Sequence, residues 1–239
     1  MNIKANTSIL YLVILGLVLL GSACQDKGDG VQGPSFQEQP ESFAFFDVGV
    51  NTRLSSHLRS TLTQVLGDES TQGNNVIDLA INYPEFLTAH FPELDELNKK
   101  LNYPPRERVE HKTTRLMFRY ASVKGLDFSY VEILFSDYTQ SPLLIRVNYK
   151  SDNPEVLKTL TDKYGDPVSI AWEKEGGPSF AWRQNNDLLI LSLVPDQFGN
   201  PTSQIFIVFE KRLVELLATE EAESLNRKAG TPARGKTPF

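Results

Sequence analysis

Three basic side chains spaced four residues apart form the first candidate site in this chain. His111, Arg115 and Arg119 share one face of a segment expected to be a β-strand. Such a row can bind an anionic group, because the planar guanidinium matches carboxylate and phosphate oxygens in geometry. The alternative is a solvent-exposed strand face whose cations pair with nearby acids. We favour this alternative because exposed ion pairs are common.

Two tryptophans form the second candidate site. Trp172 and Trp182 fall directly opposite each other if a three-residue loop at 176–178 joins their strands. Flat aromatic rings stack on sugar rings, so this pair could bind a saccharide. Packing within the hairpin or the core is the interpretation that we favour.

The sequence carries no recognisable catalytic or metal-binding pattern. His57, His90 and His111 lie far apart, and the single cysteine leaves no Cys–His set for zinc. There is no Gly-x-Ser-x-Gly turn, phosphate-binding loop or dinucleotide-binding glycine pattern. Acidic neighbours such as Glu173 and Glu175 arise by chance among 30 acids, so they do not indicate glycoside cleavage. We therefore assign no catalytic residue, metal or cofactor.

The only cysteine, Cys24, ends an N-terminal leader with three parts. Lys4 supplies positive charge, residues 9–20 form an apolar run of 12, and Ser22 and Ala23 stand directly before the cysteine. Twelve helical residues rise about 18 Å, which is less than the roughly 30 Å hydrocarbon core of a bilayer. The leader is thus typical of a cleaved signal peptide rather than a membrane span.

This arrangement resembles the signal peptide of bacterial lipoproteins. The resemblance implies that residues 1–23 are removed by cleavage between Ala23 and Cys24, and that Cys24 then carries lipid, typically three acyl chains. Two or more acyl chains anchor a protein stably. Gln25, rather than aspartate, follows the cysteine, so the resemblance implies a periplasm-facing protein of the outer membrane rather than the inner membrane. Cleavage by the ordinary secretory peptidase and an uncleaved anchor remain alternatives.

The remaining chain divides into a tether, a folded part and a tail. Residues 24–42 comprise the lipidated cysteine and a segment too polar and too rich in Gly and Pro to pack. Residues 43–225 can form one α+β domain, or a helical subdomain at 43–105 with a sheet-rich subdomain at 106–225. Residues 226–239 form a basic tail that we expect to be disordered.

Apolar periodicity predicts the elements of the folded part. Helical spacing and end signals predict helices at 51–66, 92–101, 152–164 and 211–225. Period-two alternation and turn residues predict strands at 110–120, 128–136, 143–150, 168–174, 180–184, 188–194 and 204–210. Residues 68–75 are expected to be a polar loop, and 76–81 fits either helix or strand.

These elements predict an α+β fold with a mainly antiparallel sheet of about six to seven strands and helices packed on one face. The strand at 128–136 places Val131 and Ile133 on one side, and Tyr130 and Leu134 on the other. This second side is less polar than a solvated face should be. It therefore hints at an interaction surface or a second layer.

Composition and the leader restrict the function classes. Lys4 is the only charged side chain in the leader. Removal of the leader therefore leaves 23 basic and 30 acidic side chains and a net charge near −7. An acidic chain is unsuited to nucleic acid, because phosphates require a basic surface. The expected partners are a membrane, through Cys24, and an envelope protein, and the oligomeric state is not indicated.

Three functions remain, in order of preference. The first is a non-enzymatic envelope lipoprotein that binds a protein partner or assists assembly. The second is a module that binds envelope glycan or lipid, and the third is an envelope hydrolase without a recognisable motif. A cleft with a converging histidine and carboxylate would favour the hydrolase, whereas an exposed apolar patch without a cleft would favour the first class.

Overall fold

The structure is a computed structural model that describes residues 36, 38–119, 122–123, 126–151, 154–171, 177–195 and 198–230. Residues Pro34–Phe239 form one compact unit. The predicted signal peptide, Cys24 and Trp172 lie outside the described residues.

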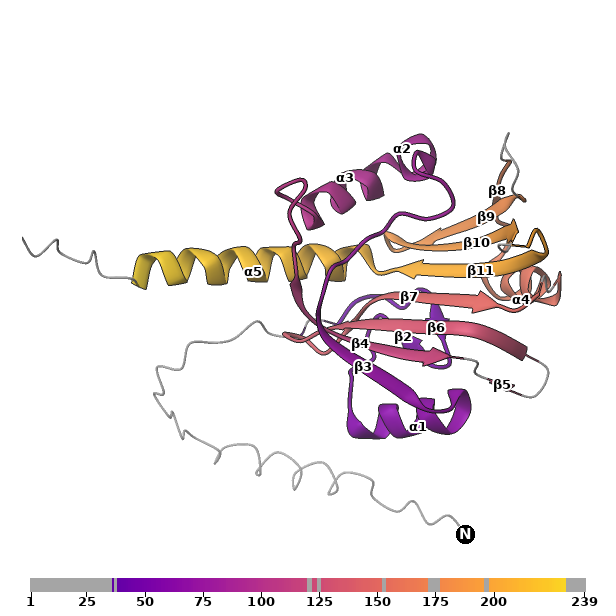
Figure 1. Cartoon of the computed structure of the whole chain (residues 1–239), viewed down its shortest axis with the longest axis horizontal. Helices are drawn as coiled ribbons and strands as arrows, with labels where there is room; N and C mark the ends of the chain where they lie inside the picture. The colour runs from indigo at the N-terminus through magenta and orange to yellow at the C-terminus, as the bar shows by residue number, and fades with distance from the viewer. Residues whose placement is uncertain are drawn as a thin grey trace, which may run out of the picture. The chain divides into compact units, whose positions relative to one another are not determined.

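A large antiparallel sheet forms the centre of this unit (Figure 1). Its main strands are β3 (Glu69–Asn75), β4 (His111–Arg119), β6 (Leu126–Ser136), β7 (Pro142–Tyr149), β8 (Val168–Ile170), β9 (Ser179–Gln184), β10 (Asp187–Pro195) and β11 (Pro201–Val208). They run in the order β3-β4-β6-β7-β11-β10-β9-β8, and the short β5 (Ser122–Val123) pairs with β6 beside this path. A separate hairpin comprises β1 (Ala44–Phe45) and β2 (Val48–Gly49). The predicted α+β class with a mainly antiparallel sheet is confirmed.

The described residues contain α1 (Ser56–Leu66), α2 (Phe86–His90), α3 (Pro92–Leu101), α4 (Pro154–Tyr164) and α5 (Glu210–Gly230). The bounds of α3 agree with the prediction, whereas α5 continues beyond residue 225. The first helix begins after Ser55, whose hydroxyl accepts a hydrogen bond from the Leu58 amide. Asn51, the first residue of the helix expected at 51–66, instead bonds through its side chain to the backbone of Gln39. The helix therefore starts later than expected, with Ser55 as its cap.

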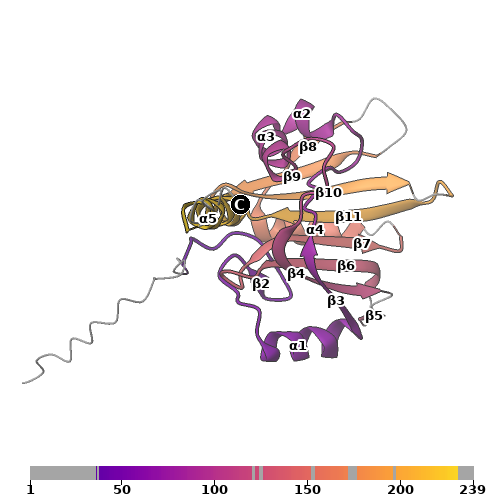
Figure 2. The ribbon, with the colours of Figure 1, turned by 60° about the vertical axis from the view of Figure 1, so that its left-hand side comes forward.

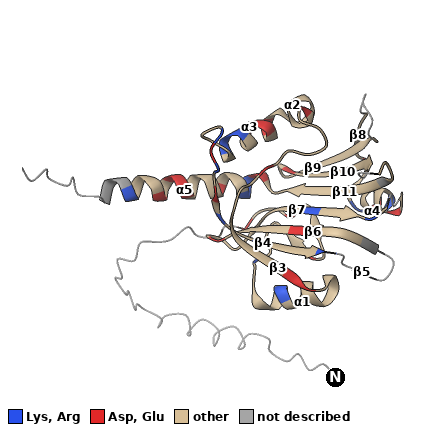
Figure 3. Cartoon of the chain, viewed as in Figure 1, with Lys and Arg blue, Asp and Glu red and all other residues tan. Residues whose placement is uncertain are grey.

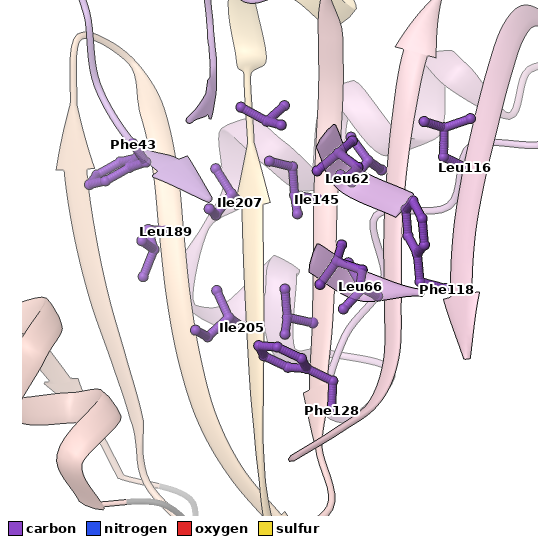
Figure 4. Packing of buried hydrophobic residues seen from close by; sticks show 14 of the residues in the cluster. Phe43, Leu62, Leu66, Leu116, Phe118, Phe128, Ile145, Leu189, Ile205 and Ile207 are labelled. Atoms are coloured by element: carbon purple, nitrogen blue, oxygen red, sulfur yellow. The ribbon is translucent and has the colours of Figure 1, made fainter. Parts of the chain in front are cut away.

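The first face of the sheet packs against α1, α4 and the β1–β2 hairpin. Ile133, Ile145 and Ile207 project from this face into an apolar cluster. Leu62 and Leu66 of α1 join this cluster, and Figure 4 shows them among the side chains of the strands. Burial of these side chains is the main favourable contribution to the packing of α1 on the sheet.

The second face packs against α2, α3 and α5. Leu134 and Leu144, each adjacent in sequence to a first-face residue, belong to a second apolar cluster. Leu94 of α3 and Leu213 of α5 complete it. Helices therefore cover both faces rather than one, which explains why the second face is less polar than a solvated face. Figure 2 shows α1 near the β3 end of the sheet, and α2 and α3 near the β9 end.

The edge strand β3 lies where the sequence predicts a loop. Its residues, Glu-Ser-Thr-Gln-Gly-Asn-Asn, are mostly exposed and show no apolar alternation. Backbone pairing with β4 holds the strand in place, with Thr71 opposite Leu116. An edge strand that contributes little to either core lacks the alternation by which strands are recognised in sequence.

The C-terminal part of the predicted tether packs on the folded unit. The Gln39 side chain donates a hydrogen bond to Glu215 of α5, and the Ser42 hydroxyl donates one to Asp187. Phe36 lies beneath the guanidinium groups of Arg53 and Arg212, at 3.8 and 4.5 Å from the ring centroid. The rest of the predicted tether, residues 25–35, lies outside the described residues.

Candidate functional site

His111 is enclosed between β4, α3 and α5. Its side chain is 2% exposed, Nδ1 lies 2.7 Å from Oε2 of Glu220, and Nε2 lies 2.9 Å from the Leu101 carbonyl oxygen. Both partners are acceptors, so both nitrogens donate only in the protonated imidazolium. Burial lowers the pKa of His111, but the hydrogen bond to Glu220 and its charge outweigh burial and raise that pKa overall. His111 therefore joins three elements and lines neither hollow described below.

Arg115 and Arg119 lie on the second face of β4, as predicted, but their environments differ. The Arg115 guanidinium lies 3.5 Å from Glu132 Oε1 and donates a hydrogen bond to the Val76 carbonyl oxygen. Arg119 is exposed at the end of the strand. His111 and Arg115 thus pair with acids, and only Arg119 has the exposure that a simple basic stripe requires.

Trp182 belongs to the core of the first face. Its side chain is 4% exposed, and its indole N–H donates a hydrogen bond to the Gly165 carbonyl oxygen at 2.7 Å. The pairing of β8 and β9 places Ile170 opposite Ser179, so the register differs from the one that a three-residue loop at 176–178 would impose. The expected register of these strands is therefore wrong, and the expected partner of Trp182, Trp172, lies outside the described residues.

An apolar hollow of about 250 Å³ opens on the first face. It is walled by the hairpin, α4 and strands β6, β7, β10 and β11, and is lined by Ala44, Phe45, Phe46, Phe128, Tyr149, Glu155, Val156, Thr159, Leu160, Leu189, Ile205 and Ile207. Burial raises the pKa of Tyr149 to about 12, so its hydroxyl stays neutral. The polar residues Glu155 and Thr159 are exposed. The hollow therefore has an apolar wall and a polar rim on α4.

The turn of the β1–β2 hairpin holds two aromatic rings at this hollow. Phe46 and Asp47 form the two-residue turn and have φ values of 43° and 61°. A positive φ is unusual for a bulky side chain and costs conformational energy. The Phe46 ring packs edge-to-face with Phe45 at 4.7 Å and with Phe128 at 6.2 Å between centroids. Aromatic packing thus offsets a strained turn beside the hollow.

A polar hollow of about 290 Å³ lies on the second face, between the sheet and residues 80–82. It is lined by Ala80, Ile81, Asn82, Tyr130, Glu132, Arg146, Asn148, Ser192, Gln204, Ile205 and Phe206. The Tyr130 hydroxyl donates a hydrogen bond to Glu132 at 2.7 Å, and Arg146 donates one to the Asp78 carbonyl oxygen. Figure 3 shows an acidic position on β6 beside a basic position on β7, and the strand register pairs Glu132 with Arg146.

Neither hollow could be identified from local sequence patterns. The apolar hollow combines Phe46, Phe128 and Leu160, which are separated by dozens of positions and meet only through tertiary packing. Arg146 is the missed cation of the second face. One signal could have indicated it: an arginine in a mostly apolar strand, Pro-Leu-Leu-Ile-Arg-Val-Asn-Tyr, is expected to have a specific partner.

No protein-family model, curated protein or solved structure matches this chain. Within the described ranges, no helix is long and apolar enough to cross a membrane. The same residues contain no group of three or more His, Cys, Asp or Glu side chains that could hold a metal ion. The chemistry of the two hollows is therefore the basis for assigning a function.

Proposed function

We propose that the chain is a lipid-anchored, non-enzymatic binding protein of the bacterial cell envelope, and that its folded part binds a lipid acyl chain in the apolar hollow. The observation that carries this proposal is the hollow itself, with its apolar wall, polar rim and strained aromatic turn. A concave apolar site favours an extended apolar ligand over a flat contact with a protein partner.

The size and lining of the hollow fit part of an acyl chain. A volume of 250 Å³ corresponds to about eight water volumes, and a methylene group is similar in size to water. Burial of each methylene contributes about 0.8 kcal/mol before the entropic cost of binding. Glu155 and Thr159 at the rim would leave the polar end of an amphiphile in contact with water. The site therefore suits a molecule with one apolar and one polar end.

The expected anchor would keep this site close to lipid. If Cys24 is acylated, residues 25–35 connect it to the part of the chain that begins at Phe36. Eleven extended residues span at most about 40 Å, so the folded unit would stay within that reach of the bilayer. The residue after the cysteine, Gln25, supports the outer membrane as the location.

The non-enzymatic part of the proposal rests on the surroundings of His111. A general base needs contact with substrate, whereas this histidine is buried and both of its ring nitrogens already have partners. The neighbouring carboxylate, Glu220, hydrogen-bonds to this ring. A histidine–carboxylate pair in this environment supports structure rather than hydrolysis.

A photoactivatable palmitate analogue tests the proposal on the full chain in membranes. We expect crosslinks in the peptides that contain Phe46 or α4, which mapping separates from acyl groups on Cys24. Leu160→Glu, which places a charge in the hollow, should reduce these crosslinks at least about tenfold, because burial of an unpaired charge is costly. Lys158→Glu adds the same side chain at an exposed position of α4 and should leave them unchanged.

Two results would overturn this assignment. Equal crosslinking of Leu160→Glu and the unmodified chain would show that the analogue does not occupy the hollow. Crosslinks confined to other parts of the chain would have the same meaning. Release of free fatty acid or of a shortened lipid by the purified chain would instead contradict a non-enzymatic role.

A further inference from the structure

A row of polar side chains crosses the second face over six adjacent strands. Successive backbone pairings align Arg119 with Tyr130, Tyr130 with Asn148, Asn148 with Gln204, Gln204 with Ser192 and Ser192 with Ser179. We call these six residues the polar row. Directly paired residues project to the same side of a sheet, so the row presents a guanidinium, a phenol, two amides and two hydroxyls side by side. Four of them, from Tyr130 to Ser192, line the polar hollow.

The segment at 80–82 converts part of this row into a concave site. Asn82 adopts a positive φ of 63°, which asparagine tolerates better than most residues, and its amide nitrogen donates a hydrogen bond to the Ser179 hydroxyl at 3.3 Å. The resulting hollow of about 290 Å³ has room for on the order of ten water volumes, which is suited to a single sugar.

The charge around the hollow favours an anionic group. Arg146 and Glu132 line the hollow, and Arg119 is paired in register with Tyr130 at one end of the row. Glu132 is already engaged, because it accepts the Tyr130 hydroxyl at 2.7 Å and lies 3.5 Å from Arg115. Arg146 lies over the Phe206 ring at 4.9 Å, which fixes its guanidinium beside the hollow. With Glu132 engaged, Arg146 and Arg119 supply the positive charge that attracts an anion at this site, although the whole chain is acidic.

Several hydrogen-bonding groups at this site have unused capacity within the described part of the chain. Arg146 Nε and Asn82 Oδ1 are buried and have no hydrogen-bond partner there. Buried groups of this kind usually have a partner, so their presence beside one hollow points to a ligand or water. The side-chain amides of Asn148 and Gln204 stand in the same row, and each offers both a donor and an acceptor.

We infer that the polar hollow binds a sugar that carries one acidic group, either a carboxylate or a phosphate. Arg146 and Arg119 attract the anion, and the amides and hydroxyls of the row contact the sugar hydroxyls. A neutral hydrophobic ligand would leave these polar groups desolvated and unpaired, which disfavours it. This site lies on the opposite face from the apolar hollow and does not depend on the acyl-chain proposal.

Calorimetric titration of the full chain in detergent tests the inference with defined probes. D-glucuronic acid represents the carboxylate and glucose 6-phosphate the phosphate, and glucose, acetate and inorganic phosphate are the controls. We expect at least one acidic sugar to bind at least about tenfold more tightly than glucose and than the corresponding free anion, because a charge-assisted hydrogen bond adds to the hydroxyl contacts. The acidic sugar that binds identifies the preferred anion.

Two variants locate the site without replacing buried residues. The first is the double variant Asn148→Ala/Gln204→Ala, which changes two half-buried side chains. It should weaken binding of the acidic sugar about tenfold or more. Leu160→Glu, in the apolar hollow, should leave this binding unchanged, so the two proposals fail separately. An unchanged thermal midpoint in each variant establishes that the fold is intact.

Three results would overturn the inference. The first is no binding of either acidic sugar, and the second is equal binding of glucose or of the free anions. The third is full binding by the folded Asn148→Ala/Gln204→Ala variant, which would place the sugar elsewhere on the chain.

Discussion

Asp187 is a buried carboxyl group whose ionisation opposes folding. Its side chain is 1% exposed, Oδ2 accepts a hydrogen bond from Ser42, and Oδ1 has no partner in the described residues. Burial raises the pKa of Asp187 from 3.8 to about 6, and the Ser42 hydrogen bond only partly opposes this effect. The neutral form therefore stabilises the folded state below pH 3.8. This contribution is lost as the pH rises through about 6.

Asp187→Asn should remove this pH dependence. A shift from 3.8 to about 6 corresponds to roughly 3 kcal/mol. The unmodified chain should lose about that much stability between pH 3 and pH 8, whereas Asp187→Asn should not. The difference in the free energy of unfolding, variant minus unmodified chain, should therefore increase by about that amount over this range. Urea denaturation at both pH values measures it. Asp47→Asn, at an exposed carboxylate in the β1–β2 turn, is the control, and a pH-independent difference for Asp187→Asn would contradict the prediction.

At the scale of elements, His111 connects α5 to the rest of the fold. The ring bonds to Glu220 of α5 and to the carbonyl oxygen of Leu101, the last residue of α3. A cation at the C-terminal end of a helix is also favoured by the helix dipole. Because the pKa of His111 is raised overall, its contribution to stability is complete below pH 6.5. That contribution is lost as the pH rises through the higher value of the folded state.

Glu220→Gln should weaken this connection most at low pH. We expect the free energy of unfolding to fall by about 1.5–3 kcal/mol at pH 6, the range for hydrogen bonds to charged groups, and by less at pH 9. Denaturant unfolding at the two pH values measures the change, and NMR titration should show a lower pKa for His111. Glu221→Gln changes an exposed neighbour on α5 and should have little effect. An equal loss at both pH values would show that His111 is not charged in the folded protein.

Elements with complete local signals were predictable, and those defined by tertiary contacts were not. Helix α3 was predicted with its observed bounds, because Pro92 begins it and Lys99 and Lys100 occupy its last turn. The polar strand β3 and the five-residue α2 carry no comparable periodicity. The same distinction applies to the site residues. The shared face of Arg115 and Arg119 follows from strand geometry, whereas their acidic partners come from other elements.

For the whole molecule, we expect the folded unit to be stable without the anchor at Cys24, and membrane attachment to require that anchor. In the described part of the chain, both apolar clusters consist of residues from Phe43 onward, and Phe36 and Gln39 add contacts nearer to Cys24. The net negative charge offers little electrostatic attraction to anionic lipid. Stable membrane attachment would therefore depend on lipid at Cys24.

Cys24→Ala should release the protein from membranes without unfolding it. We expect loss of fatty-acid labelling and transfer to the soluble fraction, because no other acyl anchor is expected. We also expect an unchanged thermal midpoint, because the described residues of both cores begin at Phe43. Fractionation, metabolic labelling and thermal unfolding measure these three outcomes. Gln25→Asp keeps the cysteine and should preserve labelling while it moves the protein toward the inner membrane. Continued acylation or membrane retention of Cys24→Ala would refute the lipoprotein assignment, and both hollows would then have to act without a lipid anchor at this residue.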